Sequence, residues 1–463
     1  MNKKINILFS SFPDFSGNPK ALYEYIIQNY KEKINTFWVF YSSEIVNILK
    51  QKNKNINFVI FKSEEYYQLF NNIDIIFDTN GFLIDEKKSH QIYVNLWHGS
   101  SPKKKGFLLP PQNFAPQDVE YYNNMHLNLD YVVVPSQFSR LIFSSVFDIN
   151  VQRVVSLGYC RDDYLFNCDG KKLLKNLFDI DISKYNKILC YLPTFRIGCN
   201  RTDSYNIWDY NLLDLQDYEE EELYKYLEEN NYLLLIKKHP SEESIIQIPK
   251  SKNVIIIDDE ILNKNFISIY EILNAVDLLI ADYSSVYVEY LLLERPVLFL
   301  HKNLEEYKKK RGIILDNINF WSPGPQITTL QSFKKEIDCL LSDDNYYSQE
   351  RKTFKTIMFD NNYKNVCKKT FEFFINSTDF TLNCTTFNSN ERNIINNLKE
   401  LSNKYNDLEV QKNKLKQINN NYEIEVTNLK QINNNLNLEL EAIYNSRSWK
   451  IVNKFKKIIR RGK

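Results

Sequence analysis

Glycine and proline are scarce in this chain of 463 residues, at 10 and 13 residues respectively. Long flexible linkers are rich in one or both of these residues, so we do not expect such linkers. The seven cysteines are scattered between Cys160 and Cys384 and form no CxxC pair. This distribution argues against a disulfide scaffold and a zinc site, and it fits a protein of a reducing compartment.

Long apolar runs are also absent, because no run approaches the roughly 20 residues that a membrane-spanning helix needs. The chain starts with MNKKINILFSSFPDF, in which Pro13 and Asp14 interrupt a short apolar run. We therefore interpret this start as a first strand and not as a signal peptide. An excess of one charge is lacking too, since 59 Lys and Arg balance 58 Asp and Glu. A nucleic-acid partner is therefore not expected.

What the chain does contain is an alternation of short apolar segments with helix-like segments. The first series has strand-like segments at residues 5–10, 36–41, 57–61, 74–77, 92–96 and 131–134, and helix-like segments at 20–29, 45–50 and from 137 onward. The second series has strand-like segments from residue 187 and at 232–236, 254–257, 278–281 and 297–300, and helix-like segments at 219–229 and 269–275. Such alternation predicts parallel sheets covered by helices. We predict an α/β protein with two Rossmann-like domains, residues 1–180 and 181–378, facing each other across a cleft.

The stretch LLIADYSSVYVEYLLLERPVLFL, residues 278–300, has the pattern of a strand, a tight turn, a helix and a second strand. Ser284 and Ser285 stand where the helix at 286–293 should begin, so we predict them as N-cap residues. This turn would bring N–H groups, two hydroxyls and the positive end of a helix to the carboxyl edge of a sheet. Open α/β sheets bind phosphorylated ligands there. An ordinary capped strand–helix–strand unit would have the same pattern.

Two histidines directly follow predicted strands. His98 stands in NLWHGSSPKKKGF, before Gly99 and three lysines, and a histidine at that sheet edge is suited to act as a general base near neutral pH. His239 stands in LLLIKKHP after two lysines, and such a group would suit a diphosphate. Surface histidines beside solvated lysines would give the same pattern.

Eight motifs then occur in a fixed order between residues 90 and 360. They are WHGSSPKKKG, GYCRDDYLF, YLPTFR, KKHP, ADYSSVYVEY, ERPVLFL, EEYKKKRG and SPGP. Together they resemble the CDP-glycerol:poly(glycerophosphate) glycerophosphotransferase family, the teichoic-acid polymerase-like enzymes. The resemblance implies the GT-B fold, with the donor held mainly by the second domain.

The resemblance also implies roles for individual residues. His98 would activate the acceptor hydroxyl, and His239 would be a second catalytic histidine at the donor phosphates. Ser284 and Ser285 would hold phosphate, and Arg311 would belong to the donor pocket. The other residues of the matched motifs that we expect to bind substrate are Gly99, Ser100, Arg161, Thr194, Arg196, Lys238, Asp282, Glu289 and Gly312.

The chain departs from the family pattern at four positions. Cys160 and Asp162 stand where the family usually has proline and asparagine. Ile197 replaces the usual acid after YLPTFR, and Glu289 replaces an aspartate. These departures bear on the identity of the donor more than on the class of reaction.

The predicted reaction is an in-line phosphoryl transfer, which needs positioning, a base for the attacking hydroxyl and cationic stabilisation of the leaving phosphate. No DxD-like acidic pair ends a strand, and we interpret Asp258 and Asp259 as the start of a helix. We therefore expect no obligatory metal and no cofactor.

The predicted function is the transfer of glycerol phosphate, or a similar polyol phosphate, from a CDP-activated donor, with release of CMP. The acceptor would be a hydroxyl of a cell-surface glycan or of a teichoic-acid- or capsule-like polymer. One alternative is a GT-B glycosyltransferase that uses a nucleotide sugar for surface polysaccharide synthesis. The other is a coiled-coil scaffold that carries a degenerate transferase domain.

The composition changes after a polar linker at residues 379–392. Apolar residues recur at alternating spacings of three and four from Leu398 to Ile443, and LKQINNN at residue 415 recurs at residue 429. This pattern predicts a coiled coil over residues 393–443 and hence a homo-oligomer.

The last segment, residues 444–463, carries eight Lys or Arg from Arg447 onward and no acidic residue. Apolar residues recur in it at helical spacing. We predict a basic amphipathic helix that binds an anionic membrane surface, so that the protein attaches peripherally to the cytoplasmic face of the cell membrane near a lipid-linked acceptor. The alternatives are a basic tail that only ends the coiled coil, or one that binds nucleic acid non-specifically.

Overall fold

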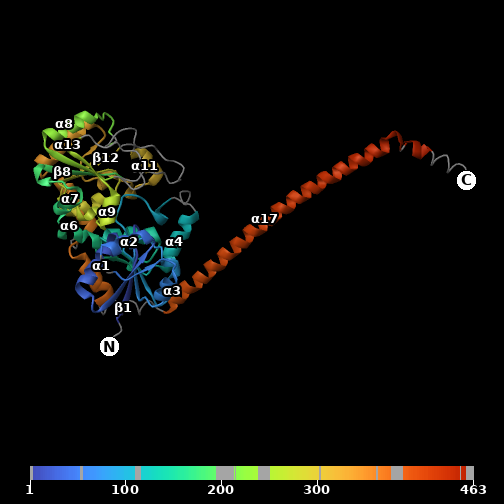
Figure 1. The fold of residues 1–463 in the computed structure, drawn as a ribbon, viewed down its shortest axis with the longest axis horizontal. Coiled ribbons are helices and arrows are strands. Elements are labelled where there is room, and N and C mark those ends of the chain that lie inside the picture. The colour runs from blue at the N-terminus through green and yellow to red at the C-terminus, as the bar shows by residue number, and fades with distance from the viewer. Residues whose placement is uncertain are drawn as a thin grey trace. The chain divides into compact units, whose positions relative to one another are not determined.

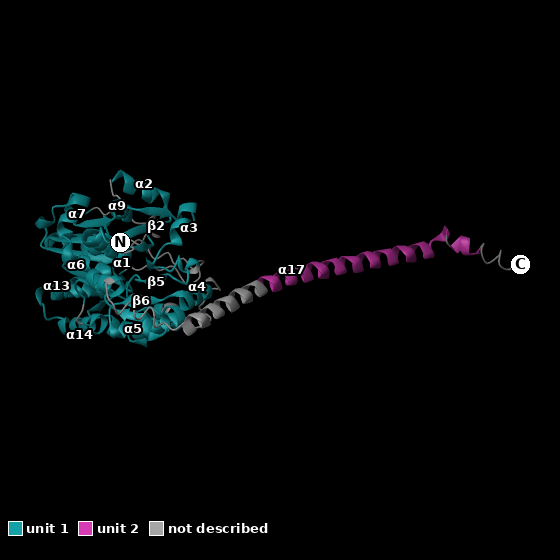
Figure 2. Cartoon of the chain, turned by 90° about the horizontal axis from the view of Figure 1, so that it is seen from below, with its two compact units in different colours: residues 1–384 teal, residues 385–463 magenta. Residues whose placement is uncertain are grey.

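The computed structural model describes residues 4–52, 56–109, 116–193, 213, 215–237, 251–301, 304–360, 363–376, 389–448 and 450–454. The chain forms two compact units, residues 1–384 and residues 385–463, which Figure 2 distinguishes by colour. The first unit holds both sheets and all the motifs singled out above. The second unit is dominated by a single long helix.

The first sheet of unit 1 has seven strands in the order β3-β2-β1-β4-β5-β6-β7, and all its pairs are parallel. Figure 1 shows this part of the chain in blue, with β1 labelled near the N-terminus. Its strands are β1 (Ile5–Phe9), β2 (Ile34–Phe40), β3 (Phe58–Ile60), β4 (Ile75–Asp78), β5 (Ile92–Asn95), β6 (Tyr131–Val134) and β7 (Val154–Ser156). The helices that connect them are α1 (Gly17–Tyr30), α2 (Ser43–Gln51), α3 (Glu64–Phe70), α4 (Pro116–Asn128) and α5 (Gln137–Phe147). Parallel strands need such crossovers, which cover both faces of the sheet.

The second sheet has six strands in the order β10-β9-β8-β11-β12-β13, again all parallel. Its strands are β8 (Lys187–Leu192), β9 (Tyr232–Lys237), β10 (Val254–Ile257), β11 (Leu278–Ala281), β12 (Val297–Leu300) and β13 (Gln326–Ile327). Its principal helices are α8 (Glu220–Glu229), α9 (Asp259–Asn265), α10 (Val286–Tyr290), α11 (Leu304–Arg311), α12 (Ile318–Trp321), α13 (Leu330–Ser342) and α14 (Ser348–Phe359). Along the chain, α6 (Asp163–Asn167) and α7 (Gly170–Phe178) come between the last strand of the first sheet and the first strand of the second. Helix α15 (Val366–Phe371) follows α14.

The alternation of side chains along a strand builds a core on each face of the second sheet. In β11, Leu278 and Ile280 join one buried cluster, whereas Leu279 and Ala281 join the other. Because both faces are buried, the strand is an uninterrupted apolar run. This explains why the sequence predicts β6, β10, β11 and β12 with the bounds that the structure has.

The α/β fold with two parallel sheets is therefore confirmed, and the differences are local. The edge strands β7 and β13 were not predicted, because three and two residues are too few to show a periodic pattern. The predicted helix at 269–275 is two short 3₁₀ turns, Ile269–Glu271 and Leu273–Ala275. The first sheet ends at Ser156 and the second begins at Lys187, and the predicted boundary at residue 180 stays a prediction.

The predicted N-cap position at the start of α10 is confirmed for Ser285, and its side chain makes no capping hydrogen bond. The backbone of Ser285 is already helical (φ −79°, ψ −19°). A serine cap needs an extended backbone that folds the hydroxyl over the first N–H groups. Instead Asp282 Oδ1 accepts the N–H of Ser284 at 3.0 Å. The helix is also shorter than predicted, since 3₁₀ geometry takes over at Leu291–Leu293.

The second unit contains α17 (Ser389–Asn445), so the predicted C-terminal helix is present. Seven of the predicted seam residues are 48–65% exposed; they are Leu415, Tyr422, Val426, Leu429, Leu436, Leu440 and Ile443. The predicted coiled coil and basic amphipathic helix stay predictions. None of the described helices combines the length and the apolar character needed to cross a bilayer.

Candidate active site

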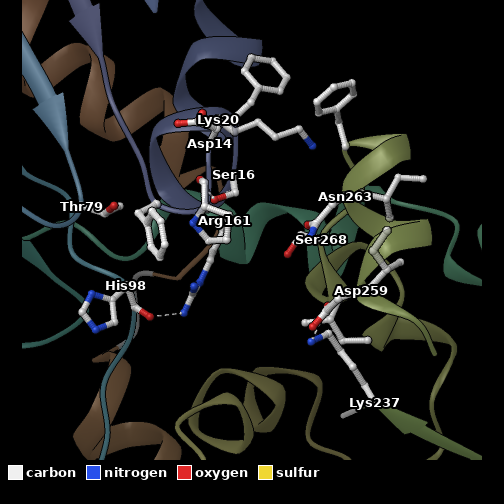
Figure 3. A pocket seen from close by; sticks show the side chains of 18 of the residues that line it. Asp14, Ser16, Lys20, Thr79, His98, Arg161, Lys237, Asp259, Asn263 and Ser268 are labelled. Atoms are coloured by element: carbon white, nitrogen blue, oxygen red, sulfur yellow. Dashed lines mark hydrogen bonds and ion pairs between the residues drawn. The ribbon is translucent and has the colours of Figure 1, made fainter. Parts of the chain in front are cut away.

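A pocket of about 210 Å³ lies where the carboxyl ends of strands from both sheets meet (Figure 3). In the first sheet the order reverses at β1, which lies between β2 and β4, and in the second sheet it reverses at β8. Open α/β sheets bind ligands at such reversal points. The loop after β1 and Thr79 after β4 line one wall. Lys237 at the end of β9 and Asp259 at the start of α9 line the other.

His98 lines this pocket, and its backbone is fixed on both sides. Trp97 before it has a positive φ of 52°, and its N–H is accepted by Asn95 Oδ1 at 2.7 Å. The buried Asn18, in the first turn of α1, donates to the carbonyl oxygens of Leu96 and Trp97 at 2.9 and 2.8 Å. The turn that carries the histidine therefore has little freedom to move.

His98 is an exposed residue that lines the pocket, and its ring has close neighbours in the protein. It stacks on the Trp97 ring with 4.3 Å between centroids, and it forms a hydrogen bond with the backbone of Thr79. This enclosure, together with the charges of Lys105, Arg161 and Lys103, holds the pKa of His98 well below 6.5. The imidazole is therefore neutral at physiological pH, as a general base must be.

Arg161 and Glu289 form a buried ion pair beside His98. Arg161 Nη2 donates to both carboxylate oxygens of Glu289 at 2.8 Å and to the carbonyl oxygen of His98 at 2.8 Å. Figure 3 shows this carbonyl turned towards Arg161, with the His98 ring on the other side of the backbone. The guanidinium carbon also lies 4.0 Å from the centroid of the Tyr270 ring. Arg161 thus connects the base to the second sheet's α10.

Gly99 makes this close approach possible. Its φ of +121° is one that residues with a side chain rarely adopt. A Cβ atom here would lie 2.7 Å from Arg161 Nη2, 2.9 Å from Glu289 Oε1 and 3.7 Å from Ser285 Oγ. The structure therefore brings together five predicted site residues, namely His98, Gly99, Arg161, Ser285 and Glu289. Ser100 is buried next to them, with its Oγ 3.1 Å from the hydroxyl of Tyr159.

The loop after His98 continues to segments of the second sheet. Lys104 N donates to the carbonyl oxygen of Gly312 at 3.2 Å, and Ile314 N donates to that of Pro102 at 2.7 Å. Gly312 has φ +69°, and a Cβ atom there would lie 2.8 Å from Lys104 Cδ. Gly312, a predicted site residue, is therefore joined through this loop to His98.

Lys105, at the end of the same loop, has an altered charge. Its Nζ lies 5.1 Å from the centroid of the Trp97 ring, on which His98 stacks. Shielding from water and repulsion by Lys103 lower the pKa of Lys105 to about 7, against an attraction from Glu289. The positive charge of Lys105 is therefore fully present only below about neutral pH, whereas that of Arg161 stays.

The remaining predicted residues divide into two groups. Asp282 is buried and Ser284 is half-buried at the start of α10, where the bond described above joins them. Thr194, Arg196, Lys238 and His239 lie outside the described residues, as does the side chain of Arg311, whose backbone ends α11. Their predicted roles stay predictions. Asp258 does cap a helix, because its Oδ1 accepts the N–H of Glu260 at 2.7 Å.

Sequence reasoning missed two residues that organise the site, Asn18 and His301. His301 follows β12 directly, the same signal that singled out His98, but it does not lie in any motif considered above. Its ring stacks on Tyr283 with 5.0 Å between centroids, and Tyr283 stacks on Tyr307 at 3.7 Å. Its Nδ1 lies 3.0 Å from Gln326 Oε1. His301 thereby ties the turn before α10 to α11, whereas no sequence signal marks Asn18.

Metal ligands are not gathered at this site: among the described residues, no three His, Cys, Asp or Glu side chains come close enough to hold an ion. The charged side chains near His98 in the described site are Lys105 and the Arg161–Glu289 pair, and Asp14, Lys20, Lys237 and Asp259 also line the pocket.

Comparison with known proteins places this geometry in a family. A teichoic acid glycerol-phosphate primase of Bacillus subtilis is 29% identical over 349 residues, which are 72% of the chain and 83% of that protein. A teichoic acid poly(glycerol phosphate) polymerase of Staphylococcus epidermidis is 27% identical over 362 residues, 76% of the chain. The chain spans about half the length of that polymerase, 48%.

The solved structures of the wall teichoic acid polymerase TagF share the fold. One of them, soaked with CDPG, superposes with a TM-score of 0.66 at 24% identity, covering 83% of the chain and 90% of that protein. The family model that matches residues 1–376 is that of CDP-glycerol:poly(glycerophosphate) glycerophosphotransferase. The chain therefore belongs to the CDP-glycerol:poly(glycerophosphate) glycerophosphotransferase family, and it is a transferase.

Proposed function

We propose that the chain transfers glycerol phosphate from CDP-glycerol to a hydroxyl of a teichoic acid polymer or cell-surface glycan and releases CMP. The observation that carries the proposal is His98, a neutral imidazole fixed at the carboxyl edge of one parallel sheet and lining a pocket between the two sheets. Family membership supports the donor and the class of reaction.

The reaction needs one base and one stabilised leaving group. The acceptor oxygen attacks the phosphorus that bears the glycerol, and His98 takes the proton of the attacking hydroxyl. The bond between this phosphorus and the oxygen shared with the cytidylate phosphate breaks, and CMP leaves with that electron pair. Positioning and electrostatics provide most of the rate in such transfers, because the protein itself forms no bond to the phosphorus.

Residues on the second sheet are assigned to the donor. Ser284 and Ser285 would donate hydroxyl hydrogen bonds to the diphosphate, with His239 and Arg311 as its cationic partners. Gly99 lies next to Ser285. The residues that would hold the attacking hydroxyl and those that would hold the leaving phosphate are therefore neighbours. Arg161 and Glu289, listed above as expected substrate ligands, form an ion pair with each other, and Arg161 also holds the His98 carbonyl, which supports a positioning role.

The test uses the purified full chain with a panel of CDP-glycerol, CDP-ribitol and UDP-sugars, and it measures released nucleotide together with labelled product. We expect CMP release from CDP-glycerol that depends on an added acceptor. A His98→Gln variant is the matched control, because it keeps a side chain of similar size that can donate but not act as a base. Release of UDP from a sugar nucleotide with none of CMP would overturn the proposal in favour of a glycosyltransferase.

We propose further that α17 forms a homo-oligomeric coiled coil, most simply a parallel dimer. Support comes from the exposed apolar seam of α17, since an isolated helix leaves such a stripe in water. At about 1.5 Å per residue, the seam from Leu398 to Ile443 would span roughly 70 Å. Sedimentation of the full chain against a chain ending at residue 392 tests this. An unchanged oligomeric state after truncation would remove the coiled coil as the assembly element.

We also propose that residues 444–463 attach the protein to the cytoplasmic face of the membrane. The segment carries eight cationic residues from Arg447 onward and no acid, and each would contribute about 1 kcal/mol near an anionic leaflet. Two copies on one coiled coil would bind much more tightly than one. Co-sedimentation with anionic liposomes should fall for a chain that ends at Ile443. Equal binding by both chains would remove the tail from the proposal.

A further inference from the structure

We infer that Asn18 is a positioning residue for the transfer, and that its side-chain amide sets the place of His98 relative to Arg161. The inference rests on the proposed function and deepens it, because it names the residue that aims the base. Asn18 is not among the residues that line the described pocket, so it would act through the segments that it holds.

The Asn18 amide uses its NH₂ group and its oxygen at the same time. Nδ2 donates to the carbonyl oxygens of Leu96 and Trp97 at 2.9 and 2.8 Å, and Oδ1 accepts the backbone N–H of Arg161 at 3.0 Å. A flipped amide would set its oxygen against two carbonyl oxygens and its NH₂ group against an N–H, so these partners fix its orientation. One fully buried side chain thus joins the segment that carries the base to the segment that carries the guanidinium.

The turn that Asn18 holds has an uncommon conformation. Trp97 has a φ of 52°, a region that residues with large side chains seldom occupy. The carbonyl groups of Leu96 and Trp97 both face the same NH₂ group in this conformation. Backbone strain of this kind persists only where the surrounding contacts maintain it. Loss of the two bonds from Asn18 would let Trp97 return towards a negative φ, and His98 would then change direction.

Asn18 itself stands on a fixed element. It lies in the first turn of α1, which contacts β1 and β2 and whose Leu22 and Ile26 are fully buried. Two residues after Asn18, Lys20 forms an ion pair of 2.9 Å with Glu271, which belongs to the second sheet's segments. The start of α1 is therefore held from both sheets, as an element that fixes the separation of two other segments must be.

The experiment measures CMP release by the full chain from CDP-glycerol with an added acceptor. Asn18→Ala should lower kcat about 10²-fold, the loss that a misplacement of a reacting group by about 1 Å can cause. The KM for CDP-glycerol should stay within about twofold, because the residues assigned to the donor do not depend on this amide. The acid limb of the plot of kcat/KM against pH should move up, since a displaced His98 is less shielded from water and lies farther from the charge of Arg161.

Asn253→Ala is the matched control, because Asn253 makes the same kind of contact away from the site. It is also buried, and its Nδ2 donates to the carbonyl oxygens of Tyr232 at 2.8 Å and Leu227 at 3.3 Å. It directly precedes β10, at the edge of the second sheet opposite the carboxyl ends of the strands. Both variants should lower the urea midpoint of unfolding, but Asn253→Ala should keep the kcat and the acid limb of the wild type.

Three results would overturn the inference and leave the proposed function standing. The first is a folded Asn18→Ala protein with a kcat within about twofold of wild type, and the second is a raised KM for CDP-glycerol with an unchanged kcat. The third is an equal loss of kcat in Asn253→Ala, because the loss would then follow stability alone. If Asn18→Ala does not fold, Asn18→Ser, which keeps one donor, is measured instead and the same results decide. No CMP release by the wild type would overturn the proposed function and this inference with it.

Discussion

The Arg161–Glu289 ion pair gives the most exacting test of how the site is built. Only 9% of the Arg161 side chain and none of the Glu289 side chain is exposed, and the two meet through bidentate contacts of 2.8 Å. Burial raises the pKa of Glu289, while the charge of Arg161 and its hydrogen bonds oppose that rise. The carboxylate thus depends on its partner to remain ionised in this environment.

Breaking such a pair should be costly, whereas removing it entirely should not. Removal of one member leaves the other charge buried without a partner, which typically costs about 3–5 kcal/mol of unfolding free energy. We therefore expect this loss for Arg161→Met and for Glu289→Leu. The double variant should be destabilised by less than the sum of the two, because it buries no uncompensated charge, with a coupling energy of about 2–3 kcal/mol.

In the double variant, the free energy of unfolding measured in urea and the turnover number kcat should respond differently. Stability should return in part, but kcat should stay low, because the His98 carbonyl has lost the guanidinium that donates to it at 2.8 Å. A purely structural pair would regain both. Additive destabilisation, with a coupling energy below about 0.5 kcal/mol, would refute the ion pair as described. Full turnover in the double variant would refute its role in positioning the base.

Three further substitutions test the chemistry of the site. His98→Gln should lower kcat about 10²–10⁴-fold and leave the KM for CDP-glycerol unchanged, and a near-normal kcat would remove His98 as the base. Lys105→Met removes a cation that lowers the pKa of His98. The acid limb of the plot of kcat/KM against pH should therefore move up towards pH 6.5, and an unmoved limb would contradict this. Asp162→Asn should stabilise the fold increasingly as the pH rises from 4 to 8. Burial raises the pKa of Asp162 well above 3.8, so the folded state keeps a proton that the unfolded state releases, and ionisation destabilises the wild type. Urea midpoints at pH 5 and pH 8 measure this difference, which would be absent if Asp162 were well solvated.

The sequence is informative where local physics decides the structure. Strands such as β11 and β12 are buried on both faces, so they appear as uninterrupted apolar runs with clear ends. The same local signal places His98 at a sheet edge. It also places the start of α10 at Ser285, but it does not reveal that the backbone there is already helical and that Asp282 makes the local hydrogen bond.

Contacts between distant segments could not be predicted in this way. Arg161 and Glu289 are 128 residues apart, and the motifs that contain them suggest substrate contacts, not a pair. Asn18 holds the turn of His98 from 78 residues away, and no periodicity marks it. Such residues act through the packing of two sheets, a property of the tertiary structure that no single window of sequence contains.

The same packing explains why segments of both sheets are needed to position His98. The loop that carries His98 leaves the first sheet, but Glu289 and Gly312, which belong to the second sheet's segments, hold it through Arg161 and Lys104. Its glycine at residue 99 lies beside the turn that we assign to the donor diphosphate, since a Cβ atom there would be 3.7 Å from Ser285 Oγ. A shift of that turn on donor binding would therefore be transmitted directly to the backbone of His98. His98 is correctly placed only when the two sheets are correctly placed, so under the proposed function proton removal from the acceptor would depend on the state of the proposed donor site.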